Sequence, residues 1–334
     1  MNVDSNSESN GLRRSVGHGL GTDVSLDHLT ELAHSEDEVI RVAVALHPAS
    51  SGPLLSLLAK DRSPWVAACA SRRLDRPAAH LASVHPSALV DPRAQLGARV
   101  TIGPYTIVHA NVQLGDDSWV GAHCELGCPA HDPSQGGLLS IGNHALIRSH
   151  SVFYEGAVLG DHLVTGHHVT VREQTKAGVA FQIGSQGDIQ GHCTVGDFVR
   201  LQSNVMICKH STIHDFVWLL PHVVLTNDPH PPSEVMKGVT IERYVAVGAN
   251  AVILPGVTVG EEALVGAQSA VTRDVARGTV FAGVPARYMC DTHEIRLKDG
   301  SNEPAYPWRR HFHRGYWPET VARWLAELGS ATGR

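Results

Sequence analysis

A six-residue period runs through most of this chain, and it restricts the possible folds more than any other feature. Three series of positions spaced by six, over 84–126, 141–225 and 241–271, hold Ile, Leu or Val at every step except Phe153, Thr165 and Ala177. Only 43% of all residues are hydrophobic, so chance does not produce such a run. An internal repeat of this kind decides the fold before local propensity does.

The length of the period selects one kind of architecture. A helix with 3.6 residues per turn would scatter a six-residue stripe around its surface, and a sandwich of amphipathic strands would alternate with a period of two. Six residues fit one short strand and one tight corner, with the aliphatic residue pointing inward. Glycine often follows the aliphatic residue, as at Gly97, Gly103, Gly115, Gly121, Gly142, Gly160, Gly166, Gly184, Gly196, Gly248, Gly260 and Gly266. The sequence therefore predicts a mainly β protein built on a parallel β-helix.

Each unit consists of an aliphatic residue, Gly, two variable residues, a small residue and a further variable one. Over about 83–290 this pattern resembles the repeats of the hexapeptide-repeat acyltransferase superfamily. The resemblance implies a left-handed parallel β-helix with three hexads per coil. Parallel crossovers are otherwise right-handed, so the left hand follows from the resemblance and not from the period. Two interruptions, at 127–140 and 226–240, are predicted to leave the prism at the same corner. Loops on a rigid scaffold often carry binding residues, although such insertions are also tolerated without a function.

The ends of the chain differ from the repeat. Residues 1–23 are polar and Gly/Ser-rich without a signal-like apolar stretch, which predicts a disordered tail. Over 24–82 the segments Ile40–Ala45 and Trp65–Ala70 resemble each other and short helical solenoid repeats, which predicts a small α-helical domain. Residues 291–334 form a C-terminal extension with an amphipathic helix at 318–328. Its aromatic and arginine-rich segment either packs on the prism or a neighbouring subunit, or contacts a phosphate or nucleotide ring.

Composition limits the partners and the compartment. The 27 Lys and Arg against 33 Asp and Glu give a net charge of -6, which argues against nucleic acid or an anionic membrane as a partner. No apolar run approaches the ~20 residues of a membrane helix. The six cysteines form no CxxC pair, and we interpret them as reduced thiols of a cytoplasmic protein. No metal is expected.

Several motifs in the coils resemble bacterial nucleotide-sugar N-acyltransferases more closely. They are Ile147-Arg148-Ser149, Thr165–Glu173, Gln202–Val205, Thr226-Asn227-Asp228 and Gly283–Arg287. The resemblance implies a homotrimer that binds acetyl-CoA or another acyl-CoA between neighbouring prisms. It also implies acyl transfer to the amine of an amino sugar or nucleotide-linked amino sugar, by direct attack on the thioester. The 127–140 loop with Ile147-Arg148 further resembles the UDP-N-acetylglucosamine acyltransferase of lipid A synthesis, but Glu173 replaces the catalytic histidine of that enzyme.

Acyl transfer requires a base that deprotonates the amine and a site that places the amine against the thioester carbonyl. It also requires a hydrogen-bond donor for the developing oxyanion. Our candidates for the base are His168, Glu173 and His167. An imidazole titrates near operating pH, whereas a carboxylate needs burial or a bridging water to act as a base. Most of the 22 histidines must be structural. The candidate substrate-binding residues are Arg148, His150, Asn204, Asn227 and Asp228.

The donor site is implied by the resemblance alone. Later coils of such enzymes give backbone groups to the pantetheine arm, for which Gly248, Gly266 and Ala267 are candidates. Basic residues contact the nucleotide phosphates, for which Arg273 and Arg287 are candidates. The glycines alternatively serve only the conformation of the corner.

Three other functions remain open, because a fold does not settle a function. One is O-acetyl transfer to a sugar hydroxyl. Another is a zinc enzyme like the γ-class carbonic anhydrases, with His162 and His167 joined by His192 or His144 of a neighbouring chain. The third is a non-catalytic scaffold with the N-terminal domain as a docking module. Zinc content and thioester consumption distinguish these alternatives.

Overall fold

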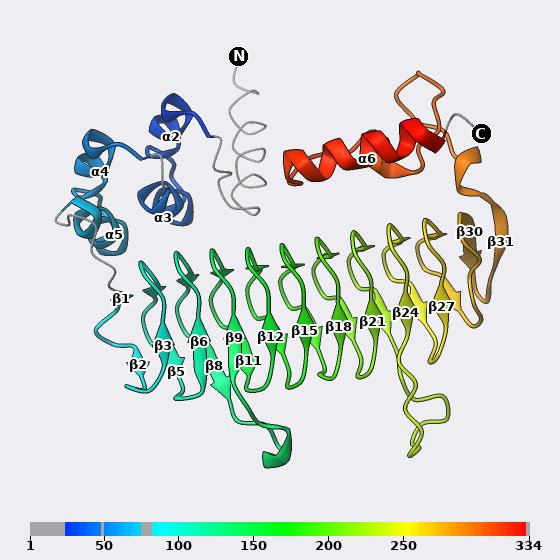
Figure 1. The fold of residues 1–334 in the computed structure, drawn as a ribbon, viewed down its shortest axis with the longest axis horizontal. Coiled ribbons are helices and arrows are strands. Elements are labelled where there is room, and N and C mark those ends of the chain that lie inside the picture. The colour runs from blue at the N-terminus through cyan, green and yellow to red at the C-terminus, as the bar shows by residue number, and fades with distance from the viewer. Residues whose placement is uncertain (1–23, 48–49, 75–81, 332–334) are drawn as a thin grey trace. The chain divides into compact units, whose positions relative to one another are not determined.

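The computed structural model describes residues 24–47, 50–74 and 82–331 (Figure 1), so the predicted tail over 1–23 lies outside the described residues. The chain divides into two compact units. One consists of the residues up to Ser83 together with Ala98–Val100, and the other of Val84–Gly97 and Thr101–Arg334. None of the described helices is long and apolar enough to cross a membrane.

The described part of the first unit contains two successive pairs of helices. They are α2 (Leu26–Leu32), α3 (Glu38–Leu46), α4 (Gly52–Leu58) and α5 (Pro64–Leu74). The side chains of Ser25, Asp37 and Ser51 each accept a hydrogen bond from a backbone N–H in the first turn of the helix that follows, which satisfies one of its free donors. The similar segments Ile40–Ala45 and Trp65–Ala70 fall in α3 and α5, the second helix of each pair.

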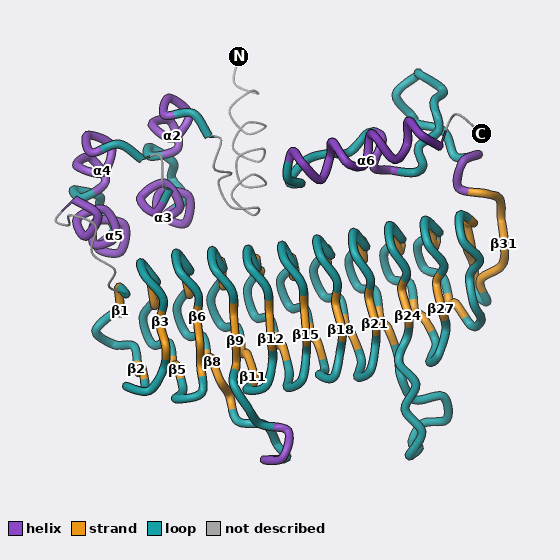
Figure 2. Tube along the Cα trace, in the orientation of Figure 1, coloured by secondary structure: helices purple, strands orange, loops and turns teal. Residues whose placement is uncertain are grey.

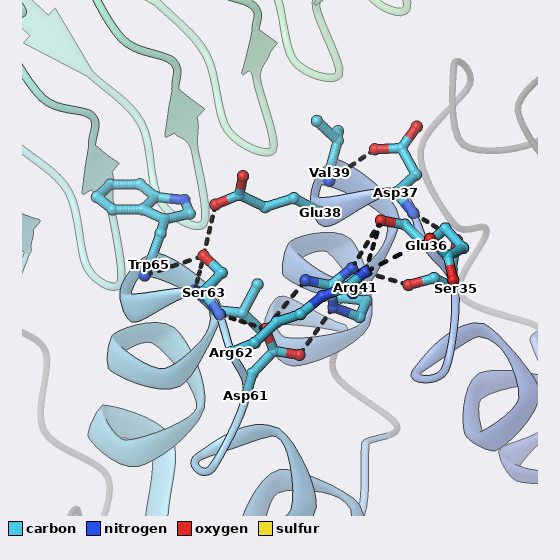
Figure 3. Close-up of polar contacts among 11 residues, drawn as sticks. Ser35, Glu36, Asp37, Glu38, Val39, Arg41, Asp61, Arg62, Ser63 and Trp65 are labelled. Atoms are coloured by element: carbon cyan, nitrogen blue, oxygen red, sulfur yellow. Dashed lines mark hydrogen bonds and ion pairs between the residues drawn. The ribbon is translucent and has the colours of Figure 1, made fainter.

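A buried ion pair joins the two helix pairs (Figure 3). Arg41 Nε lies 2.7 Å from Asp61 Oδ2 and its Nη2 lies 3.0 Å from Oδ1. The third nitrogen donates to the carbonyls of Ser35 and Glu36. Hydrogen bonding between the two side chains raises the pKa of Arg41 and lowers that of Asp61. The arginine thus connects the turn before α3 to the turn before α5.

The second unit is a prism with three parallel sheets, consistent with the predicted left-handed β-helix (Figures 1 and 2). Sheet A contains β1 (Ser83–Val84), β4 (Thr101–Ile102), β7 (Trp119–Val120), β10 (Leu146–Ile147), β13 (Val164–Thr165), β16 (Gln182–Ile183), β19 (Arg200–Leu201), β22 (Trp218–Leu219), β25 (Ala246–Val247), β28 (Leu264–Val265), β30 (Thr279–Gly283) and β31 (Ala286–Asp291). Sheet B contains β2 (Leu89–Val90), β5 (Ile107–Val108), β8 (Glu125–Cys128), β11 (Val152–Tyr154), β14 (Thr170–Val171), β17 (Asp188–Ile189), β20 (Met206–Ile207), β23 (Val224–Leu225), β26 (Val252–Ile253) and β29 (Ala270–Val271). Sheet C contains β3 (Gln95–Leu96), β6 (Val112–Leu114), β9 (Leu139–Ile141), β12 (Val158–Leu159), β15 (Lys176–Ala177), β18 (Thr194–Val195), β21 (Thr212–Ile213), β24 (Thr240–Ile241) and β27 (Thr258–Val259).

The register of these sheets confirms the period. Thr165 pairs with Ile183 and Ile183 with Leu201, so residues 18 apart are neighbours within one sheet. The aliphatic positions point inward and are buried in the middle coils, as are two of the exceptions, Phe153 and Thr165. Among the described strands, β31 alone runs antiparallel, against β30 at the C-terminal end of sheet A.

Three edges separate the sheets, and we name each by its contents. The histidine edge, between sheets A and B, carries His123, His150, His168 and His222. The loop edge, between sheets B and C, carries both insertions, which project on the same side of the prism in Figure 1. The prediction that both leave at one corner is therefore confirmed. The aromatic edge, between sheets C and A, carries Phe198, Phe216 and Tyr244.

The corners explain much of the histidine content. Corner residues have φ near +60°, a conformation that histidine tolerates better than most side chains. Histidines occupy this position at His123, His144, His150, His162, His168, His192, His210 and His222. Their number therefore reflects backbone geometry as much as chemistry.

The C-terminal extension packs on the aromatic edge. α6 (Pro318–Ala331) places Trp324, which is fully buried, edge-on against Phe216 at a ring-centroid distance of 4.9 Å. Arg200 projects from sheet A, donates to the carbonyls of Arg314 and Gly315, and lies 4.3 Å from the ring centroid of Tyr316. The first interpretation of this segment, packing on the prism, thus describes the structure.

Arg309, in the short 3-10 helix η3 (Trp308–Arg310), is also part of this packing. It forms ion pairs with Glu262 at 2.9 Å and Glu327 at 3.0 Å and lies over the Tyr244 ring. This arginine is therefore engaged within the chain and does not present its guanidinium to a phosphate.

Candidate active site

The histidine edge holds most of the predicted site residues in one row. The rings of Tyr105, His123, His150 and His168 stack in that order, with centroids 5.0, 5.0 and 4.7 Å apart. The row continues through the equivalent corner residues Gln186, Asn204, His222, Asn250 and Gln268. Imidazole and amide groups thus follow one another along a single exposed edge.

His167 precedes His168 at this edge and has a more specific environment. Its Nδ1 lies 2.7 Å from the hydroxyl of Ser149 in the preceding coil, and its backbone N–H donates to Ser185 Oγ at 3.1 Å. Partial burial and then the charge of Arg148 lower the pKa of the imidazole, which favours the neutral form. When Nδ1 donates to Ser149, Nε2 is a proton acceptor.

Arg148 explains why a threonine interrupts the aliphatic series. The backbone N–H of Arg148 donates to Thr165 Oγ1 at 3.0 Å, and its Nη1 donates to the Thr165 carbonyl at 2.5 Å. Thr165 is fully buried, so its hydroxyl requires this donor. The guanidinium is thereby held beside His167.

Gly248, Gly266 and Ala267 lie farther along the histidine edge. A Cβ on Gly248 would lie 2.4 Å from the backbone nitrogen of Ala267, and one on Gly266 would lie 2.7 Å from the Cβ of Ala282. The positive φ at these corners belongs to Asn250 and Gln268 instead. The structure therefore gives Gly248 and Gly266 a structural role in the close stacking of the coils, and not in a positive φ at their own positions.

Glu173 belongs to the loop edge, on the other side of β14. Its two carboxylate oxygens lie 3.0 and 3.1 Å from Arg172 Nη2 and Nε, and Lys209 Nζ lies 3.9 Å away. Five extended residues span roughly 15 Å, so Glu173 and His168 of one chain do not meet at one reacting amine. Acting as a base would also require Glu173 to leave its ion pair with Arg172.

Asn227 and Asp228 begin the second insertion, also at the loop edge. Asp228 accepts hydrogen bonds from the hydroxyl of Ser233 at 2.6 Å and from the backbone N–H groups of His230 and Ser233. These bonds, that of the Ser233 hydroxyl first, lower the pKa of Asp228. The carbonyl of Asn227 accepts from Lys237 N at 2.7 Å. In this structure both residues shape the loop.

The two basic candidates for the donor site are separated. Arg273 is exposed and follows β29, at the end of sheet B. Arg287 is exposed in β31, where its Nη1 donates to the carbonyl of Ala286. They do not lie on one edge, because the hairpin of β30 and β31 extends sheet A.

The sequence did not reveal the residues that hold the first insertion. Glu155 Oε1 accepts from the backbone N–H of Ala130 at 3.0 Å, and Asn111 Nδ2 donates to the other oxygen. Gln174 Nε2 donates to the Gln135 carbonyl at 3.0 Å. Glu155 occupies the coil position equivalent to that of Glu173. This equivalence is the one sequence signal that could have identified Glu155.

The zinc alternative requires His162 and His167 near one point. His162 lies at the aromatic edge instead, stacked on His144 and edge-on to Trp317. Within the part of the chain that the structure describes, no three His, Cys, Asp or Glu side chains are arranged to hold a metal ion.

The chain matches known proteins over parts of its length. Residues 238–273 match the family model described as the hexapeptide repeat of succinyl-transferase. Together with the three-sheeted prism, this match defines a parallel β-helix of hexapeptide repeats. A 2,3,4,5-tetrahydropyridine-2,6-dicarboxylate N-acetyltransferase of Staphylococcus aureus (strain bovine RF122 / ET3-1) is 48% identical over 73 residues, which are 22% of this chain and 30% of that protein. The chain thus spans about a third of the length of the curated relatives it matches.

Solved structures superpose on part of the chain. The UDP-N-acetylglucosamine acyltransferase of Arabidopsis does so with a TM-score of 0.47 at 17% identity, covering 62% of this chain and 74% of its own. The UDP-N-acetylglucosamine acyltransferase of Campylobacter jejuni gives a TM-score of 0.40 at 18% identity, covering 72% of this chain and 81% of its own.

Stability is expected to fall in mildly acidic solution. Burial lowers the pKa of His162, His167 and His192 below the usual value of about 6.5. The unfolded chain then binds protons more readily, so stability is full above about pH 6.5 and decreases as pH falls through the lowered pKa values. Thermal melts from pH 8 to 5 measure this decrease. A melting temperature that stays constant down to pH 5 would contradict it.

Proposed function

We propose that this protein transfers an acetyl group from acetyl-CoA, or another acyl group from its acyl-CoA, to the amine of a small molecule. The observation that carries the proposal is the His167 imidazole, which reaches the surface and is held by Ser149, and whose pKa is lowered toward the neutral form by partial burial and the charge of Arg148. A neutral imidazole is the commonest general base in such chemistry. The N-acetyltransferase that shares 48% identity over 73 residues supports the same reaction class.

The proposed reaction is a direct attack on the thioester. The amine nitrogen forms a bond to the carbonyl carbon, the carbon–sulfur bond breaks, and the proton of the amine passes to His167 Nε2. The protonated imidazole then returns it to the departing thiolate. His168 lies beside His167 as the second candidate for this role, with Arg148, His150 and Asn204 as orienting groups on the same edge.

We propose a homotrimer in which the histidine edge of one chain faces the loop edge of the next. The aromatic edge is covered by the chain's own C-terminal extension, which leaves these two edges for contact. Such an arrangement would bring Glu173, Asn227 and Asp228 of one chain toward His167 of another. It would also place the backbone of Gly248, Gly266 and Ala267 along a groove for the pantetheine arm.

We propose an amino sugar, free or nucleotide-linked, as the acceptor, in keeping with the sequence motifs around Arg148 and Asn227. A reducing compartment such as the cytoplasm suits the six cysteines, none of which forms a disulfide.

Release of free thiol from acetyl-CoA tests the activity. The panel contains amino sugars, nucleotide-linked amino sugars and the matching sugars with a hydroxyl in place of the amine. We expect release that depends on the amine, from a protein whose mass in solution is three times that of one chain. Release with the hydroxyl sugars instead would move the function to O-acetylation. A protein that contains bound zinc and consumes no acyl thioester would contradict the proposal.

A further inference from the structure

A compact group of charged and imidazole side chains lies on the loop edge between the two insertions. It consists of Arg172, Glu173, His192, Lys209 and His210, which we call the cation cluster. Glu173 is buried and binds Arg172 through both oxygens, at 3.0 and 3.1 Å. Lys209 Nζ lies 3.9 Å from the same carboxylate, and the rings of His192 and His210 are 5.4 Å apart. The fixed charges of the cluster sum to a cation even when both histidines are neutral.

A glycine makes this cluster possible. Residues 18 apart stack on one edge, so Gly191 stands between Glu173 and Lys209. A Cβ at Gly191 would lie 2.7 Å from the Glu173 carbonyl oxygen and 3.6 Å from its carboxylate carbon. Because this coil has no side chain there, the two cationic groups lie on coils roughly 10 Å apart and still share one carboxylate.

The Glu173 carboxylate orients the cationic side chains but leaves several of their N–H donors without an acceptor in the described part of the chain. Arg172 is fixed by its two bonds to Glu173 and by the Tyr154 ring, whose centroid lies 5.4 Å from the guanidinium carbon. Within the described residues, its Nη1 and the ring nitrogens of His192 and His210 make no hydrogen bond. Among the residues that the structure describes, Lys209 forms one long ion pair, with Glu173. Several N–H donors therefore remain for a ligand, of which that of Arg172 is held in a fixed position.

The two insertions confine this part of the edge. The first is held against Gln174, the residue after Glu173, through the Gln135 carbonyl. At the base of the second, a Cβ on Gly238 would overlap the carbonyl oxygen of His210. Each loop therefore rises directly beside one end of the cation cluster.

We propose that the cation cluster binds the phosphate groups of a diphosphate-bearing ligand. The remaining Nη1 donor of Arg172, an ammonium and two imidazoles are spread over three coils and match an anion with several oxygens over that length. Charge-assisted hydrogen bonds to the arginine and the lysine are the stronger ones. A single carboxylate would reach only one end of the cluster. The inference deepens the proposed function and rests on it only in one respect, namely that the amine acceptor is the molecule that carries the diphosphate.

Titration calorimetry on the full chain tests this site without requiring turnover. Inorganic pyrophosphate, uridine diphosphate and coenzyme A are the probes. Lys209→Gln is expected to weaken pyrophosphate binding about tenfold, and Lys209→Arg to restore most of it. Lys176→Gln, which removes an exposed lysine of sheet C, is the matched control and should bind as the natural protein does.

The outcomes separate the site from the activity. Tight binding of uridine diphosphate together with weak binding of coenzyme A would support an acceptor that carries the diphosphate. If coenzyme A alone binds, and its binding depends on Lys209, the cluster would be assigned to the phosphates of the acyl donor. No binding of any probe at millimolar concentration, or equal loss in Lys176→Gln and Lys209→Gln, would overturn the proposal. Absence of thiol release with intact pyrophosphate binding would reject the proposed function and leave the anion site standing.

Discussion

Replacement of His167 with alanine is expected to lower kcat/KM for acetyl transfer by a factor of about 10² to 10⁴, the usual contribution of a general base. The pair formed by His167 Nδ1 and the Ser149 hydroxyl, 2.7 Å apart, fixes the orientation of the ring. Without the imidazole the amine loses its proposed proton acceptor. Thiol-release kinetics on the folded variant measure the loss.

Two further variants make this expectation specific. His144→Ala removes another stacked corner histidine, on the aromatic edge, and should change kcat/KM less than threefold if His167 acts through its chemistry. The activity of the natural protein should fall as the His167 ring becomes protonated, at a pH below about 6.5, since the pKa of His167 is lowered and only the neutral ring accepts a proton. Normal kinetics in His167→Ala together with a large loss in His168→Ala would move the role to His168.

Replacement of Trp324 with alanine is expected to cost about 3–5 kcal/mol in the free energy that holds the C-terminal extension on the prism. The side chain is fully buried, and its ring centroid lies 4.7 Å from that of Tyr316 and 4.9 Å from that of Phe216. Truncation removes the central ring of this packing and leaves a cavity. Limited proteolysis followed by mass spectrometry should show rapid cleavage within the extension while the coils stay resistant.

An exposed position of the same helix provides the control. Leu325 is 49% exposed, and Leu325→Ala should change stability by less than about 0.5 kcal/mol. Equal protease resistance of Trp324→Ala and the natural chain would show that the extension is held by other contacts, such as those of Arg200 with the Arg314 and Gly315 carbonyls.

The sequence predicted some contacts of the active-site candidates and not others. The 18-residue spacing places Ser149 one coil from His167, and the structure joins them by a hydrogen bond. The sequence could not show that Glu173 is bound to Arg172, or that Asp228 is bound to Ser233 within its own loop. Rotamers of neighbouring side chains decide such contacts, and the repeat does not constrain them.

The sequence by itself determined the β-helix, the inward-pointing series and the placement of both insertions on one edge. Each coil repeats the same local geometry, so a short-range pattern propagates into the whole prism. Only the tertiary structure decided that Phe198, Phe216 and Tyr244 receive the C-terminal extension, and that the three candidate bases lie on two different edges. The extension joins residues about a hundred positions apart, as in the bond from Arg200 to Gly315. No periodic pattern links such distant segments, because their contact depends on the complementary shape of two surfaces that exist only after each has folded.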